Sequence, residues 1–108
     1  MDYGNRTDGT PKGTGFFGEL KRPKGGVSTE ISVGVGINGK QMEIPLIVPT
    51  LTKQELDYLL KTDVKSKTFF NNMPPTIMDK AYEHANQRIE SGMSPFAGPD
   101  DIVAPPAK

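Results

Sequence analysis

The chain of 108 residues contains no cysteine and no tryptophan, and its charged residues balance to a formal net charge of zero. Without cysteine it has no disulfide framework and no thiolate metal site. No apolar run approaches the roughly 18 residues of a membrane span, and the first residues lack the charged-then-apolar order of a signal peptide. We therefore expect a small soluble protein that is not associated with a membrane.

Large apolar residues are scarce and loop-forming residues are abundant. Leu, Ile, Val and Phe make up about 22% of the chain, just above the level below which chains stay disordered. The chain has 12 glycines and 10 prolines, and both of its ends are polar or rich in proline. We expect an extended N-terminal arm over residues 1–14, a single domain over 15–92 and a C-terminal tail over 93–108, with arms that become ordered against a partner.

Residues 27–48 predict a β-hairpin. Apolar residues occupy every second position on both sides of Asn38-Gly39, which is the preferred pair for a two-residue type I′ turn. With this turn Val33 faces Ile44, so the apolar faces of the two strands coincide.

The same register predicts where the hairpin has an edge. Pro45 falls opposite Ser32, at a position whose missing N–H points away from the partner strand. Proline is tolerated there if the return strand is an edge. A third strand would then pair with the 27–36 side, and residues 15–20 are the candidate.

Two helices are predicted to cover the hairpin. Thr52 and Glu55 form a capping box that begins the first helix. Residues 62–74 are expected to form a loop, which Phe69 and Phe70 anchor to the core.

The second helix opens at Pro74-Pro75, has one apolar face and ends before Gly92. The expected fold class is therefore α+β. A small antiparallel hairpin or three-stranded sheet packs against two helices, with extended N- and C-terminal arms.

Residues 13–18 match the pattern G-x-G-x-x-G. A dinucleotide site needs a strand before this pattern and a helix after it, so that the phosphates meet a helix N-terminus. Here a polar arm precedes it, and a proline and two glycines soon follow. We interpret it as a glycine-rich turn around Phe16 and Phe17, and we expect no cofactor.

His84 is the only histidine and lies at the border of the apolar face of the second helix. Histidine can act as a general base or a metal ligand. No cluster at metal-ligand spacing accompanies it, and no nucleophile can be matched to it. We expect His84 to make a structural hydrogen bond, and we expect no metal site.

The carboxylates do not form an obvious acid–base pair. Glu30 and Glu43 share one face of the predicted hairpin but are not directly opposite. Asp79, Glu83 and Glu90 lie on the outer side of the second helix, where a solvated face is the simpler interpretation. A glycan hydrolase would need two carboxylates about 5 to 9 Å apart and a sugar subsite. We expect a protein that is not an enzyme.

The segment 12–24 combines basic and aromatic residues. Its basic residues are Lys12, Lys21, Arg22 and Lys24. Together with Phe16 and Phe17 they could bind phosphates and stack bases, which leaves nucleic-acid binding open as an alternative. Nucleic-acid-binding domains are usually strongly basic, however, and this chain is neutral. An interface with protein is favoured for the same residues.

Three groups of residues carry a resemblance to a known family. They are DGTPKGTGFFGEL at 8–20 with RP at 22–23, GVSTE at 26–30 and SVGV at 32–35; EIP at 43–45 with VPTLT at 48–52; and KA at 80–81, HA at 84–85, RI at 88–89 and GMSPFA at 92–97. Over residues 8–97 the chain resembles a small domain encoded by tailed bacteriophages and prophages. That domain occurs alone and as a segment of long phage proteins that look like virion or DNA-ejection components.

The resemblance implies a setting and no catalytic residues. It suggests a non-catalytic virion protein, associated with the capsid or head–tail assembly, that is made in the host cytoplasm and then joins the particle. Its partners would be other virion proteins or further copies of itself, because arms can embrace neighbours and an open sheet edge can accept a strand. The contact residues predicted from the sequence are Phe16, Phe17, Lys21, Arg22 and Phe96. Two alternatives remain, an early protein that inhibits a host protein and a virion protein associated with DNA.

Overall fold

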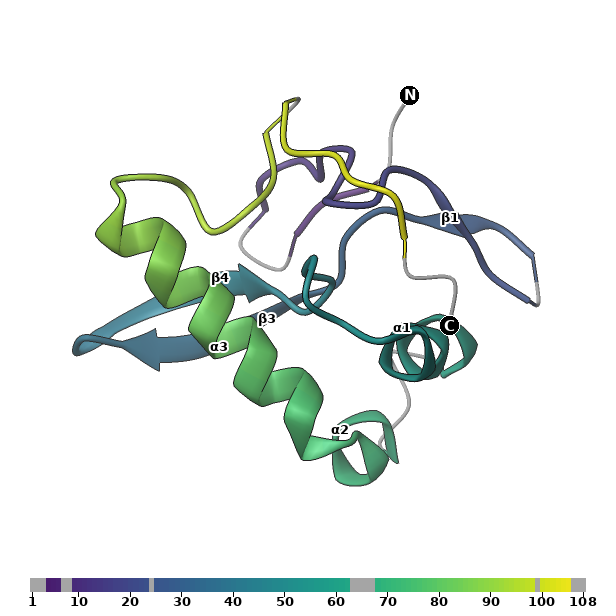
Figure 1. Cartoon of the computed structure of the whole chain (residues 1–108). Helices are drawn as coiled ribbons and strands as arrows, with labels where there is room; N and C mark the ends of the chain where they lie inside the picture. Colours follow the sequence, from purple (N-terminus) through teal and green to yellow (C-terminus); the bar gives the residue numbers. More distant parts are fainter. Residues whose placement is uncertain (1–3, 7–8, 24, 63–67, 99, 106–108) are drawn as a thin grey trace.

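The computed structural model describes residues 4–6, 9–23, 25–62, 68–98 and 100–105. Its elements in chain order are β1 (Leu20–Lys21), β2 (Val27–Ser28), β3 (Ser32–Ile37), β4 (Lys40–Pro45), α1 (Lys53–Lys61), α2 (Thr68–Asn72) and α3 (Pro75–Glu90). The strands form two antiparallel sheets of two strands each, β1–β2 and β3–β4. The α+β class expected from the sequence is confirmed, and α3 crosses the β3–β4 hairpin (Figure 1).

The β3–β4 hairpin has the predicted register. Val33 pairs with Ile44, and Ser32 pairs with Pro45. The turn residues 38–39 have φ angles of 53° and 79°, the left-handed conformation that a type I′ turn requires. Ile44 is fully buried while Val33 is partly buried, so the apolar face of the hairpin faces the core as expected.

The long strand expected over residues 27–37 is interrupted. Residues 29–31 are not strand, so β2 and β3 belong to different sheets, and the described residues form no three-stranded sheet. The candidate third strand over 15–20 contributes only Leu20, which pairs with Ser28 in β2. Residues 29–31 are all buried, so their burial does not follow the alternation expected for a strand with one buried face.

The helix boundaries follow the capping signals. In α1 the Thr52 hydroxyl accepts from the Glu55 N–H and the Glu55 carboxylate accepts from the Thr52 N–H, which confirms the capping box. At the end of α3, Gly92 has a φ of 77°, and the Met93 N–H donates to the Arg88 carbonyl at 2.8 Å. This is the hydrogen bond of a Schellman motif, and it confirms Gly92 as the residue after the helix.

The loop expected over residues 62–74 contains a short helix, α2. Residues 63–67 lie outside the described residues. Phe69 in α2 is fully buried, as predicted, but Phe70 is 52% exposed and does not anchor the segment. A five-residue helix has too few turns to show an apolar period, so its sequence does not distinguish it from a loop.

Glu55 joins α1 to α3 as well as capping α1. Its Oε1 accepts from the Lys80 ammonium at 2.6 Å, and its Oε2 accepts from the Thr76 hydroxyl at 2.5 Å. Burial raises the pKa of this carboxyl, but the hydrogen bonds from Lys80, the Thr52 N–H and Thr76 outweigh burial and lower the pKa to about 2. The ionised form is therefore the one that the fold stabilises.

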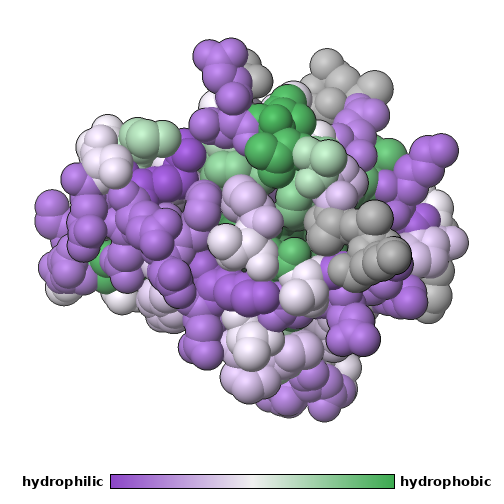
Figure 2. All heavy atoms as spheres, in the orientation of Figure 1, coloured by the Kyte–Doolittle hydropathy of each residue, from purple (hydrophilic) through white to green (hydrophobic). Residues whose placement is uncertain are grey.

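The described parts of the terminal segments fold onto the domain instead of extending from it. Residues 5 and 11 form a β-bridge, and the Arg6 N–H donates to the Thr10 carbonyl at 2.7 Å. In the C-terminal segment, the Val103 N–H donates to the Phe16 carbonyl at 2.7 Å. Hydrophobic residues gather on the visible surface where this segment runs (Figures 1 and 2).

We expect Leu59→Ala to lower the free energy of unfolding by about 2–5 kcal/mol, because a cavity remains where a fully buried side chain is removed. Leu60→Ala is the matched control, since Leu60 is only partly buried at the edge of the core. Urea unfolding measures both variants. Equal losses would contradict the orientation of α1.

We also expect Glu55→Gln to lower stability at pH 7 by an amount that shrinks toward pH 2. Because the folded pKa of about 2 lies below the ordinary value of 4.5, the ionised Glu55 stabilises the fold fully above pH 4.5 and loses this effect as the pH falls through 2. The loss at pH 7 is on the order of 2 kcal/mol. Urea unfolding at several pH values tests it, with Glu83→Gln on the exposed side of α3 as control. A pH-independent difference between Glu55→Gln and the wild type would contradict the prediction.

Candidate functional site

Three of the five predicted contact residues are core residues. Phe16, Phe17 and Phe96 are 2%, 6% and 9% exposed, so in this conformation they do not present a surface to a partner. The glycine-rich turn explains the first two. Gly15 has a φ of 74°, and a Cβ built on it would lie 2.0 Å from the Thr29 carbonyl oxygen, so this turn requires glycine. It directs the neighbouring aromatic rings inward.

Of the two predicted basic contact residues, Lys21 is the last residue of β1 and Arg22 follows it directly. Lys21 is exposed. Arg22 is half-buried, and its Nε donates to the Ser28 hydroxyl at 2.6 Å while its Nη1 donates to the Leu60 carbonyl at 3.0 Å. Both acceptors are neutral, and no carboxylate of the described residues lies within ion-pair distance of Arg22. Its positive charge is therefore held in place without compensation.

Arg22 lines a groove of about 440 Å³ between the N-terminal segment, the β2–β3 connection and α2. The residues around it are Asn5, Lys12, Arg22, Ser28, Glu30, Ile31, Ser32, Val33, Gly34, Phe69 and Phe70. The groove thus collects residues from four separate parts of the sequence. Of the predicted contact residues, only Arg22 belongs to it.

The groove has an apolar wall formed by Ile31, Val33, Phe69 and Phe70. The two phenylalanine rings meet edge to face, with centroids 4.9 Å apart. The Tyr58 hydroxyl donates to the Phe69 carbonyl at 2.5 Å, which ties α2 to α1. The exposed ring of Phe70 is therefore presented from a fixed position.

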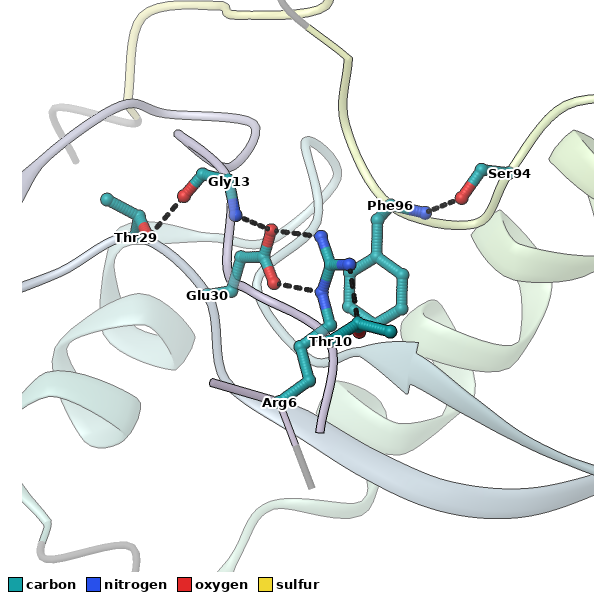
Figure 3. A network of polar contacts seen from close by, with 7 residues as sticks. All are labelled: Arg6, Thr10, Gly13, Thr29, Glu30, Ser94 and Phe96. Carbon is teal, nitrogen blue, oxygen red and sulfur yellow. Dashed lines mark hydrogen bonds and ion pairs between the residues drawn. The ribbon is translucent and has the colours of Figure 1, made fainter. Parts of the chain in front are cut away.

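Glu30 lines the groove, but its negative charge is compensated by an ion pair with Arg6. The Arg6 guanidinium donates to both of its carboxylate oxygens, at 2.7 and 2.8 Å, and the Gly13 N–H donates at 2.9 Å (Figure 3). The Arg6 guanidinium also lies over the Phe96 ring, 3.9 Å from its centroid. Since Arg6 balances Glu30, the remaining charges of the groove are the cations Lys12 and Arg22.

One side of the groove follows the free edge of β3. The Leu46 N–H donates to the Ile31 carbonyl at 2.7 Å. This bond shows which residues of β3 point their backbone groups toward β4 and which point them away. Every second residue from Ile31 therefore bonds to β4, and the N–H and C=O groups of Ser32, Gly34 and Gly36 point away from it. No described strand pairs with these groups.

His84 does not make the predicted hydrogen bond through its buried ring nitrogen. Its Nδ1 has no hydrogen-bond partner among the described residues, and its ring meets Phe16 edge to face at 4.7 Å. Burial lowers the pKa of His84, the Arg88 charge lowers it further, and Asp101 opposes both. The neutral ring is thus favoured at pH 7, and it packs against Phe16.

Arg88 fastens that C-terminal segment. Its guanidinium donates to the Ser94 carbonyl at 2.6 Å, to the Phe96 carbonyl at 3.1 Å and to the Asp101 carboxylate at 3.1 Å. The hydrogen bond from the Gly98 N–H and the one from Arg88 lower the pKa of Asp101. The described part of the tail is therefore bound to α3.

Within the described ranges, no group of three potential ligands could hold a metal ion, and no helix is long and apolar enough to cross a membrane. Comparison of the chain with family models, curated proteins and solved structures finds no match. What the protein does is therefore inferred from the groove and from the resemblance at residues 8–97.

We expect Glu30→Ala to destabilise the protein by roughly 3 kcal/mol, because it removes the carboxylate that accepts two hydrogen bonds from Arg6 and one from the Gly13 N–H. Adding Arg6→Met to Glu30→Ala should recover part of this loss, since the double variant also removes the cation that Glu30 compensates. A double-mutant cycle by denaturant unfolding measures the coupling. Simple additivity of the two single losses would show that the ion pair is not coupled.

Proposed function

We propose that this protein is a non-catalytic virion component that binds other proteins of a phage particle through the groove beside β3. The observation that carries the proposal is the free edge of β3, which lies along a groove with an apolar wall and two cations. The resemblance to a domain of tailed phages supplies the setting, with synthesis in the host cytoplasm before assembly into the particle.

The form of the groove favours a protein as its partner. Its volume of about 440 Å³ would suit a small molecule equally well. A small molecule, however, cannot satisfy a row of backbone donors and acceptors at strand spacing, whereas an extended chain can. The carboxylate at the groove, Glu30, is held by Arg6 and Gly13, so its position serves the fold.

The proposal predicts that the protein is present in particles of the phage that encodes it, at a fixed copy number that matches a symmetry of the shell or tail. Quantitative mass spectrometry of purified particles measures this, with DNA-filled and emptied particles analysed separately. A known capsid protein in the same sample is the internal standard.

The outcomes separate the candidate functions. A constant copy number in filled and emptied particles supports a structural component. Loss on emptying supports a component that leaves with the DNA. Complete absence from particles would overturn the proposal and favour a protein directed at the host.

A further inference from the structure

We propose that the groove binds an extended, acidic segment of another protein, which adds to β3 as a new strand. This inference rests on the proposed function, because it specifies the partner chemistry of the same groove. It concerns the described residues of β3 (Ser32–Ile37), the apolar wall and the cations Lys12 and Arg22.

The outer edge of β3 has backbone hydrogen-bonding groups that an added strand could pair with. Ser32, Gly34 and Gly36 direct their N–H and C=O groups outward, and these groups have no described hydrogen-bond partner. Gly34 and Gly36 are exposed and have no side chain that could hinder the approach of another backbone. An added strand would hydrogen-bond to these residues in the alternating pattern that β4 uses on the other edge.

The apolar wall gives the added strand a side-chain preference. Alternate side chains of a strand lie on one face of the sheet. Those on the Val33 side would enter the groove and pack against Phe70. Because Phe70 is 52% exposed, an apolar partner side chain there would remove a large aromatic surface from water. We therefore expect a β-branched or aromatic residue at alternate positions of the partner.

The charges make the partner acidic. Neither Lys12 nor Arg22 has a carboxylate partner among the described residues. The Glu43 carboxylate lies against Gly34, with Oε1 3.1 Å from the position of a Cβ on that glycine. An acidic partner group is therefore repelled near Gly34 and attracted where Lys12 and Arg22 line the groove. A guanidinium held by neutral acceptors, as in Arg22, is well suited to bind a carboxylate.

The same features argue against the two other occupants of the groove. Nucleic acid would bring phosphates, and phosphates cannot donate to the outward carbonyls of β3. The tail of a second copy is acidic at Asp100 and Asp101, but Asp101 is held by Arg88 and the Val103 N–H by Phe16. Both occupants are nevertheless outcomes of the test below.

The probes are immobilised arrays of short peptides in which valine or isoleucine alternates with threonine, and in which one end carries two aspartates, two lysines or two serines. The whole chain is labelled and applied to the arrays. We expect the aspartate set to bind at least roughly tenfold more strongly than the other two sets. No binding above background in the aspartate set would overturn the proposal. The particle measurement is independent of this result.

Two protein variants test the charges. Combined Lys12→Ala and Arg22→Ala should lower binding to the aspartate set by roughly tenfold or more. Combined Lys40→Ala and Lys61→Ala is the matched control, because both lysines are exposed and lie outside the groove. Equal losses in the two double variants would show general charge attraction and would contradict a site at the groove.

N-methylated peptides test strand addition without any change to the protein. In a bound strand, every second peptide N–H points toward β3 and the others point away. One series of peptides is methylated at the amides that point toward β3, which removes these donors. The other series is methylated at the amides that point away, which leaves the donors intact. We expect binding to be lost in the first series and retained in the second. Equal effects of both series would overturn strand addition.

Two further measurements cover the other occupants. Binding of single-stranded oligothymidine that is stronger than binding of the aspartate peptides, with a steep loss in salt, would assign the groove to nucleic acid. Concentration-dependent self-association in sedimentation velocity that the Lys12 and Arg22 double variant abolishes would assign it to a second copy. Either result would overturn the proposal.

Discussion

The buried ion pair between Glu30 and Arg6 is the interaction on which the arrangement of the N-terminal half depends. A carboxylate that is 2% exposed is costly to hold unless a cation and further hydrogen bonds compensate it. Arg6 and Gly13 supply them, which brings the N-terminal segment onto the domain. Arg6 in turn lies over Phe96, so the same pair also contacts the C-terminal segment. Two segments that look like free arms in the sequence are thereby folded against the domain.

The hairpin could be predicted in detail because three independent signals agree on one register. The Asn38-Gly39 turn, the apolar alternation and the position of Pro45 each specify the same pairing, and a slip of one residue would violate all three. The interruption at residues 29–31 could not be predicted from that pattern. Thr29 is buried and its hydroxyl donates to the Gly13 carbonyl at 2.7 Å, a contact between distant segments that a local sequence period does not contain.

The site was only partly predictable for the same reason. Arg22 was expected at an interface and lines the groove, while Phe16, Phe17 and Phe96 were expected there and lie in the core. An aromatic residue in a segment rich in glycine and proline has no period that indicates which way it points. The apolar wall from α2 and the free edge of β3 are tertiary features. The nearest sequence signal was Pro45, which predicted that the return strand is an edge and that a third strand pairs with the 27–36 side. No described strand pairs with β3 on that side, so the free edge of β3 was not predicted.

The two edges of the β3–β4 sheet are protected differently, and this asymmetry bears on function. Open edges invite unwanted pairing, and proteins commonly block them with proline or with charged side chains. The outward positions of β4 hold Gln41, Glu43 and Pro45, which include both devices. Those of β3 include two glycines, which have no side chain of their own to block a backbone. Because only the edge of β4 is protected in this way, a further strand can add to the sheet only at the edge of β3. The unprotected edge, that of β3, lies at the groove that Arg22 lines, and Arg22 has no carboxylate partner among the described residues. The edge that is open to pairing therefore also carries the charge that can distinguish one partner from another.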